Sequence, residues 1–162
     1  MERKRGFEIA KGFEDKNINM PVRKTKYSAG YDIEAAEDCI IPEYKPGQKP
    51  TLVKTGLKAY MKENEYMMLC NRSSNPFKKG LVMANSVGII DADYYGNPDN
   101  DGAFMFAFYN FFDHDVEIKK GDVIGKAMPS EAINRKNEYI NPVIRITVTS
   151  VSYTHLRAHE TL

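Results

Sequence analysis

The chain has 162 residues, which is enough for one domain with a sizeable core. Its 23 basic and 22 acidic residues leave a net charge of +1, so we expect no strong field that would attract nucleic acid or an anionic membrane. No apolar stretch approaches the roughly 18 residues of a spanning helix, and no apolar run follows the basic start, so neither a membrane span nor a signal peptide is expected.

Short apolar or alternating runs recur along the chain, and Gly, Pro, Asn and Asp residues separate them. The best candidate for a short helix starts near Ser73, where serine side chains could cap free amides. This pattern predicts an all-β, jelly-roll-like barrel or sandwich with at most one short helix. The expected strands are Ile33–Ala35, Cys39–Ile41, Thr51–Val53, Leu57–Tyr60, Tyr66–Cys70, Leu81–Ala84, Ala103–Asn110, Val116–Ile118, Asp122–Met128 and Val143–Val148.

We expect residues 1–150 to form this single domain. Residues 151–162 contain two of the three histidines, show no strand alternation and resemble a peptide translated from synthetic adapter DNA. They are therefore expected to be a non-native or disordered tail. Cys39 and Cys70 belong to no metal-binding spacing, and we expect them to be buried, reduced residues of a cytoplasmic protein.

Residues suited to binding gather in the segment Asn85–Gly96, between the apolar run Leu81–Ala84 and the aromatic run Phe104–Phe112. The segment holds Asn, Gly, two carboxylates and two tyrosines, and we expect it to form a β-turn. Strands on both sides of polar turn residues hold side chains and backbone amides in fixed positions, as a binding site requires. The following stretch, Asn97–Gly102, is a strong turn in which Gly102 can supply a positive φ.

Two further segments carry groups suited to phosphate chemistry. Arg72 offers five donors in a planar fork, and the hydroxyls of Ser73 and Ser74 add donors for an anion. A structural ion pair and an ordinary helix cap remain the alternative for these residues. Asp32 follows Gly30 at the expected start of a strand, where an ordinary surface carboxylate is the alternative.

The segment Asn85–Gly96 resembles the uracil-recognising hairpin of the trimeric dUTP pyrophosphatases, the dUTPases. Ala29–Ile33, Asn71–Ser74 and Gly121–Lys126 resemble three further motifs of that family. The resemblance implies hydrolysis of dUTP by water to dUMP and pyrophosphate, which limits uracil incorporation into DNA and supplies dUMP. It also implies a homotrimer with sites between subunits, and a magnesium ion held chiefly by the triphosphate and waters.

The same resemblance assigns roles to single residues. Asn85 and the backbone of Gly88, Ile89 and Ile90 would face the uracil edge, where a tight pocket rejects the methyl group of thymine and mismatches cytosine. Asp91 would act as general base, Tyr94 would pack on the deoxyribose and Met105 would lie beside the nucleotide, whereas Asp93 is assigned to the structure of the turn. The phosphates would contact Arg72, Ser73, Ser74 and Lys126, and Asp32 would reach the metal through water.

Two departures from the family pattern leave alternatives open. Lys126 stands where the family usually has Gln, although Lys can still donate to a phosphate. The family ends in a Gly-rich segment with Arg and Phe that closes over the substrate, and no glycine follows Gly125 here. A nucleotide-binding protein without efficient turnover is therefore one alternative. A dCTP deaminase, which shares the fold, is another, but the chain has no Glu between Glu65 and Glu117 to serve in the central hairpin.

Overall fold

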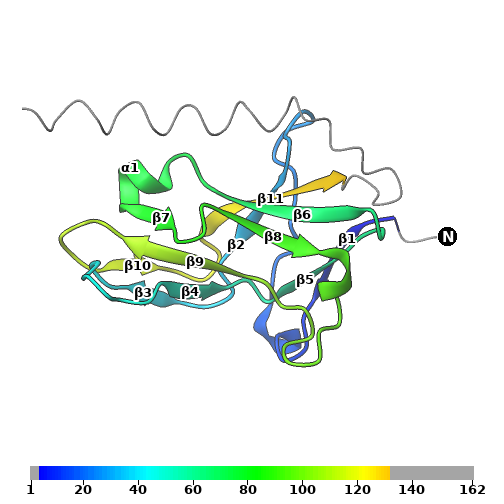
Figure 1. Cartoon of the computed structure of the whole chain (residues 1–162), viewed down its shortest axis with the longest axis horizontal. Helices are drawn as coiled ribbons and strands as arrows, with labels where there is room; N and C mark the ends of the chain where they lie inside the picture. The colour runs from blue at the N-terminus through cyan, green and yellow to red at the C-terminus, as the bar shows by residue number, and fades with distance from the viewer. Residues whose placement is uncertain (1–3, 132–162) are drawn as a thin grey trace, which may run out of the picture. The chain divides into compact units, whose positions relative to one another are not determined.

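The computed structural model describes residues 4–131 (Figure 1). Its helical elements are one short α-helix and two 3-10 turns: α1 (Asn75–Lys79), η1 (Glu14–Lys16) and η2 (Ala92–Tyr94). Its strands are β1 (Gly6–Ile9), β2 (Tyr31–Glu34), β3 (Cys39–Ile41), β4 (Thr51–Lys54), β5 (Leu57–Tyr60), β6 (Glu65–Asn71), β7 (Leu81–Met83), β8 (Val87–Asp91), β9 (Met105–Asn110), β10 (Val116–Ile118) and β11 (Val123–Glu131).

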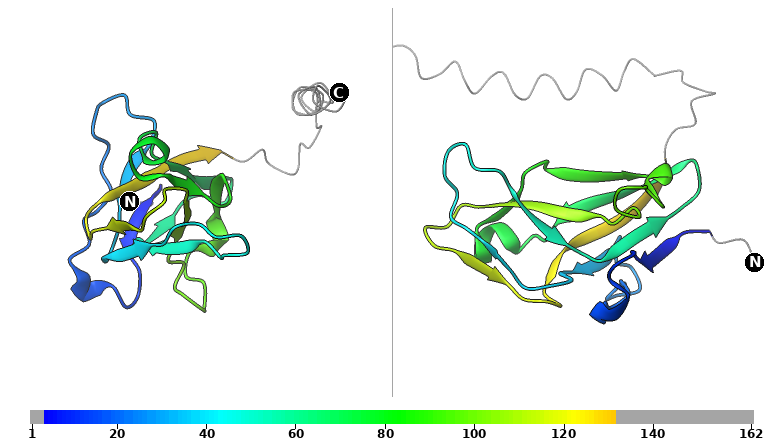
Figure 2. Two further views of the ribbon diagram at one scale, coloured as in Figure 1. Left: turned by 90° about the vertical axis from the view of Figure 1, so that its left-hand side faces the viewer. Right: turned by 90° about the horizontal axis from the view of Figure 1, so that it is seen from below.

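The paired strands are antiparallel and form two main layers. One sheet has the order β2-β11-β6-β8, and a second has the order β4-β9-β7. Two smaller sheets pair β1 with β5 and β10 with β3. Figures 1 and 2 show the β2-β11-β6-β8 sheet on one side of the core and β3, β4 and β9 on the other. The predicted all-β, jelly-roll-like fold with one short helix is therefore confirmed.

The core lies between these layers because buried and exposed side chains alternate along the strands. In β9, Phe106 and Phe108 are fully buried, whereas Met105 faces outward. The two buried rings stack with centroids 5.9 Å apart and planes 9° apart. Burial of each ring stabilises the fold by roughly 1.5–3 kcal/mol, so β9 is a main contributor to the core.

One buried amide joins the second layer to its neighbours. The side chain of Asn110 is completely buried, and its Nδ2 donates to the carbonyls of Ile41 (3.0 Å) and His114 (2.8 Å). Its Oδ1 accepts a hydrogen bond from the amide of Phe112 at 2.9 Å. An amide suits this position because it donates twice and accepts, which satisfies every polar atom that burial removes from water.

The expected strands that fall within residues 4–131 are all present. Three have the predicted ends and the others are shifted; β11, for example, continues to Glu131 instead of ending at Met128. The expectation of a turn for Asn85–Gly96 is wrong in part, because a turn at residues 84–86 leads into a strand, β8, which η2 follows. The strand β1 was not predicted either. Gly88 interrupts the apolar alternation of β8, so that segment shows only a weak strand pattern.

Cys39 and Cys70 are free thiols and are half-buried instead of buried. The expected strand Val143–Val148 and the expected tail at 151–162 lie outside the described residues. Across residues 4–131, no helix has the length and apolarity needed to cross a membrane.

Candidate active site

A pocket of about 320 Å³ opens beside β8, η2 and the start of β9. It is called the β8 pocket below. It collects every residue that the sequence assigned to the base, the sugar and the attacking water. Its lining residues are Leu52, Leu69, Asn85, Gly88, Ile89, Ile90, Asp91, Asp93, Tyr94, Ala103, Phe104 and Met105.

The residues of β8 alternate between buried and exposed, and four consecutive ones line the pocket. Ile90 is 5% exposed and belongs to the core, whereas Ile89 is 54% exposed. Gly88 is buried against β6, where a Cβ atom would lie 3.1 Å from the Cβ of Leu69. This packing distance is too short for most side chains. Glycine therefore keeps the strand close to β6 and leaves its backbone uncovered towards the pocket.

The carboxylate of Asp91 is exposed at the end of β8, in the cap position before η2. It makes no capping hydrogen bond, and no ion pair or side-chain hydrogen bond to it occurs within residues 4–131. Its oxygens are thus available for a water molecule or a substrate hydroxyl. Asp93, expected to be a turn residue, lies in η2 and also lines the pocket.

Tyr94 is half-buried, packs against the hydrophobic core and lines the pocket. The sequence did not indicate four apolar lining residues. Leu52 lies in β4, Leu69 lies in β6, and Ala103 and Phe104 directly precede β9. The one local signal was the alternation around Met105, which places its side chain outward, on the same face as Leu52.

The residues assigned to the phosphates gather elsewhere, at the far end of β6. We call Asp32, Arg72, Ser73, Ser74 and Lys126 the Arg72 cluster. The guanidinium of Arg72 donates to the carbonyl of Val123 at 3.4 Å. Lys126 pairs in register with Asp32 of β2. These residues come from β2, from β11 and from the connection between β6 and α1.

Ser74 occupies the cap position of α1, as expected, but its side chain makes no capping hydrogen bond. The expectation that a serine hydroxyl caps this helix is therefore wrong for Ser74. Instead, the backbone carbonyl of Ser74 accepts a hydrogen bond from the amide of Lys78 at 2.8 Å. Because the hydroxyl of Ser74 is not used as a cap, it is available to an anion.

Asp32 is buried, with 7% of its surface exposed, between two lysines. The ammonium of Lys126 lies 2.7 Å from Oδ1, and that of Lys24 lies 3.1 Å from Oδ2. Burial raises the pKa of this carboxyl, but the hydrogen bonds from Lys126 and Lys24 outweigh burial and hold the pKa below its ordinary value. Asp32 is therefore ionised at neutral pH, and Lys126 is already engaged with it.

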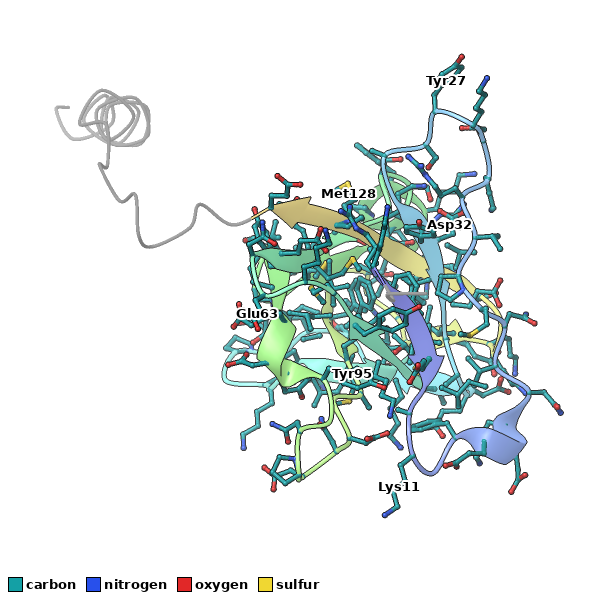
Figure 3. All side chains as sticks on the ribbon, turned by 90° about the vertical axis from the view of Figure 1, so that its right-hand side faces the viewer. Lys11, Tyr27, Asp32, Glu63, Tyr95 and Met128 are labelled. Atoms are coloured by element: carbon teal, nitrogen blue, oxygen red, sulfur yellow. The ribbon has the colours of Figure 1, made fainter. Side chains whose placement is uncertain are left out.

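The β8 pocket and the Arg72 cluster do not meet within one chain. Asp91 pairs with Tyr66 of β6, whereas Arg72 follows the other end of that strand. The six positions from 66 to 72 correspond to about 20 Å of extended chain. Figure 3 likewise shows Asp32 far from Tyr95, the neighbour of Tyr94. Asp91 and the Arg72 cluster are therefore separate within one chain.

Metal-binding groups are sparse in the part of the chain that the structure describes, where no three His, Cys, Asp or Glu side chains form a metal cage. Mg²⁺ is commonly bound through one or two carboxylates, waters and substrate phosphates. The Arg72 cluster offers one carboxylate, Asp32, and both of its oxygens are paired with lysines. It therefore fits contact with the metal through water, and it does not fit an all-protein site.

Sequence and structure comparisons indicate the same protein family. The sequence model of the dUTPase family matches residues 16–129. A deoxyuridine 5'-triphosphate nucleotidohydrolase of Lactococcus lactis is 51% identical over 127 residues, which is 77% of this chain and 82% of the relative. The crystal structure of the dUTPase from Streptococcus mutans is similar with a TM-score of 0.74 and 40% identity, over 80% of this chain and 97% of that one.

A more distant structure has the same fold. A mutant form of the dUTPase from phage phi11 of S. aureus aligns with a TM-score of 0.64 and 20% identity, over 82% of this chain and 93% of that one. That protein is described as coordinating a structural Mg(II) ion.

Proposed function

The chain belongs to the dUTPase family, and from this membership we propose how its own residues bind and hydrolyse dUTP. The reaction is the hydrolysis of dUTP to dUMP and pyrophosphate. The observation that carries the assignment of residues is the β8 pocket, which joins an uncovered strand backbone, an exposed carboxylate and a tyrosine ring.

The base of the nucleotide occupies the β8 pocket. Its uracil edge meets the backbone of Gly88, Ile89 and Ile90 and the side-chain amide of Asn85. A close backbone rejects the methyl group of thymine by contact. Cytosine is rejected because its donors and acceptors leave buried polar groups of the site unpaired.

Asp91 is the general base. Its carboxylate is exposed at the pocket and is not engaged by a side chain of residues 4–131, so it can accept the proton of a water that attacks the α-phosphorus. The expelled group is pyrophosphate, and dUMP remains. General base catalysis of this kind contributes about 10²–10⁴-fold to the rate.

The Arg72 cluster holds the phosphates. Arg72 suits phosphate oxygens because of its planar donors, and Ser73, Ser74 and Lys126 add hydroxyl and ammonium donors. A magnesium ion held chiefly by the triphosphate and waters, with Asp32 reaching it through water, would neutralise phosphate charge. Because the cluster lies about 20 Å from Asp91 within one chain, the phosphates of a bound nucleotide are held by a neighbouring subunit.

A homotrimer provides that neighbour. The outward face of the β4-β9-β7 sheet carries exposed apolar side chains, with Leu52 55%, Val82 40% and Met105 36% exposed, beside Lys54. Exposed apolar faces mark interaction surfaces. Leu52 and Met105 also line the β8 pocket, so an interface on this face places a second subunit beside the site. The two free cysteines agree with a cytoplasmic location.

Asp91→Asn tests the assignment of the base, because the amide keeps the shape of the side chain and removes its basicity. We expect turnover of dUTP to fall by about 10²-fold or more, with nucleotide binding largely kept. Pyrophosphate release and calorimetric binding of dUMP are the two measurements. Asp93→Asn is the matched control, since it makes the same change two residues away. Unchanged turnover in Asp91→Asn would show that another group is the base.

The second candidate is a nucleotide-binding protein of the same fold without efficient turnover. It is favoured by one observation, the absence of glycine from residues 126–162, where the family's Gly-rich closing segment is expected. A steady-state assay decides between the two, because a binder takes up dUMP and dUTP but releases no pyrophosphate. A deaminase is disfavoured because no Glu is among the residues that line the β8 pocket.

A further inference from the structure

We propose that Asn100 is a positioning residue that holds the ring of Tyr94 in place, and that this contact sets the selection of deoxyribose over ribose nucleotides. The inference rests on the proposed function, in which Tyr94 packs on the sugar. It adds a residue from the Asn97–Gly102 turn, which takes no part in the pocket lining described above.

Asn100 uses its whole side-chain amide in three contacts. Its Nδ2 donates to the hydroxyl of Tyr94 at 2.7 Å and to the carbonyl of Ala103 at 3.1 Å. Its Oδ1 accepts a hydrogen bond from the amide of Gly102 at 3.0 Å. An amide can donate twice and accept in this way, whereas a carboxylate cannot donate. One contact therefore reaches the tyrosine, and the other two fix the orientation of the amide.

The turn that carries Asn100 is itself anchored to the rest of the domain. One carboxylate oxygen of Asp101 accepts hydrogen bonds from the ammonium of Lys58 (2.7 Å) and from the backbone amide of Lys11 (2.8 Å). Figure 1 shows this turn lying beside the N-terminal segment, and Figure 3 labels Lys11 there. Lys58 belongs to β5, so the anchor joins the turn to a strand that does not carry the pocket.

Close packing at Gly102 ties the turn back to Tyr94. Gly102 has a φ of +80°, and a Cβ atom there would lie 2.5 Å from the carbonyl oxygen of Tyr94. The amide of Asn97 donates to the same carbonyl at 3.1 Å, so the same turn holds both the backbone and the hydroxyl of Tyr94. Such double support fixes the position of a ring far better than packing on one face.

The position of the ring decides whether a ribose fits. A tyrosine packed flat against the sugar excludes a 2′-hydroxyl only while it cannot move away, because a small displacement makes room for one oxygen atom. Loss of the Asn100 contact should therefore strengthen the binding of ribonucleotides more than it weakens the binding of deoxyribonucleotides. A residue with a merely structural role would weaken both classes equally.

The test compares Asn100→Ala, Tyr94→Phe and the double variant in the full chain. Equilibrium binding of dUMP and UMP by calorimetry gives the dUMP/UMP preference without turnover, and kcat/KM for dUTP and UTP gives it with turnover. We expect the preference to fall by about 3- to 10-fold in each single variant. The double variant should show no further loss, because both changes remove the same hydrogen bond.

Asp99→Ala is the matched control, since it truncates an exposed neighbour in the same turn and should leave the preference unchanged. An unchanged preference in Asn100→Ala, or losses that multiply in the double variant, would overturn the proposal. If Asn100→Ala unfolds, Tyr94→Phe still tests the proposal. An unchanged dUMP/UMP preference in Tyr94→Phe would also overturn it. Wild-type protein that binds neither nucleotide would instead contradict the proposed function.

Discussion

One carboxylate oxygen of Asp101 anchors the Asn97–Gly102 turn to Lys58 and Lys11. Its hydrogen bond from Lys58 lowers its pKa, and the amide of Lys11 adds to this effect. The same hydrogen bond raises the pKa of Lys58. Both groups are therefore charged over a wider range of pH in the folded protein than in the unfolded chain, and folding stability depends on pH accordingly.

The contribution of Asp101 to folding stability should decrease in acid. Because the folded pKa of Asp101 is depressed, its stabilising contribution is complete above its unfolded value of about 3.9 and is lost as the pH falls through the folded value. Asp101→Asn should therefore lower Tm at pH 7, and the difference from wild type should shrink below about pH 4. Thermal unfolding at pH 7, 5 and 3.5 measures it. A difference that persists unchanged at the lowest pH would show that charge is not the cause.

The strand β8 lines the pocket and is half-buried. Its residues alternate between the core and the solvent, so a shift of one position changes the whole environment of a side chain. Two adjacent isoleucines test the half-buried placement of β8, because Ile90 is 5% exposed and Ile89 is 54% exposed.

We expect Ile90→Ala to lower the free energy of unfolding by about 2–5 kcal/mol, because it leaves a cavity in the core. Ile89→Ala should change it by about 0.5 kcal/mol or less, since it removes exposed surface, but should weaken nucleotide binding. Urea unfolding of both variants measures the two values. Equal losses of stability would contradict the half-buried placement of β8.

At the level of the assembled protein, the separation of the β8 pocket from the Arg72 cluster predicts complementation between subunits. Asp91→Asn and Arg72→Ala protein should each have little activity alone. When they are mixed in equal amounts, unfolded and refolded together, about a quarter of the sites between subunits combine an intact Asp91 with an intact Arg72. Pyrophosphate release should rise to about that fraction of the wild-type rate.

Each variant refolded alone is the control for this experiment, and sedimentation gives the number of subunits. No gain in activity on mixing, in samples that sediment as trimers, would show that each site is built within one chain.

The end of the chain provides a last prediction. Residues 151–162 lie outside the described residues, and the expectation for them rests on composition. We propose that residues 1–150 hold the whole domain. Deletion of 151–162 should then leave Tm, dUMP binding and turnover unchanged. A loss of turnover with unchanged dUMP binding would show that these residues act on the triphosphate.

Much of this architecture follows from local patterns in the amino-acid order. The alternation in β6 and β9, the turn at Asn97–Gly102 and the residues proposed to carry the chemistry all stand within short windows of the sequence. This is possible because a strand exposes every second residue, and because Gly, Pro and Asn mark turns by their backbone preferences. Where the pattern is weak, as at Gly88 in β8, the prediction failed.

The spatial relations between distant segments cannot be obtained in this way. The register that pairs Asp91 with Tyr66, the contact of Lys126 with Asp32 and the hydrogen bond from Asn100 to Tyr94 arise only in the folded chain. A local window reports which face of a strand is buried. Which strands pair, and in what register, depends on the shape of the whole core and on how loops close, and these are properties of the chain as a whole.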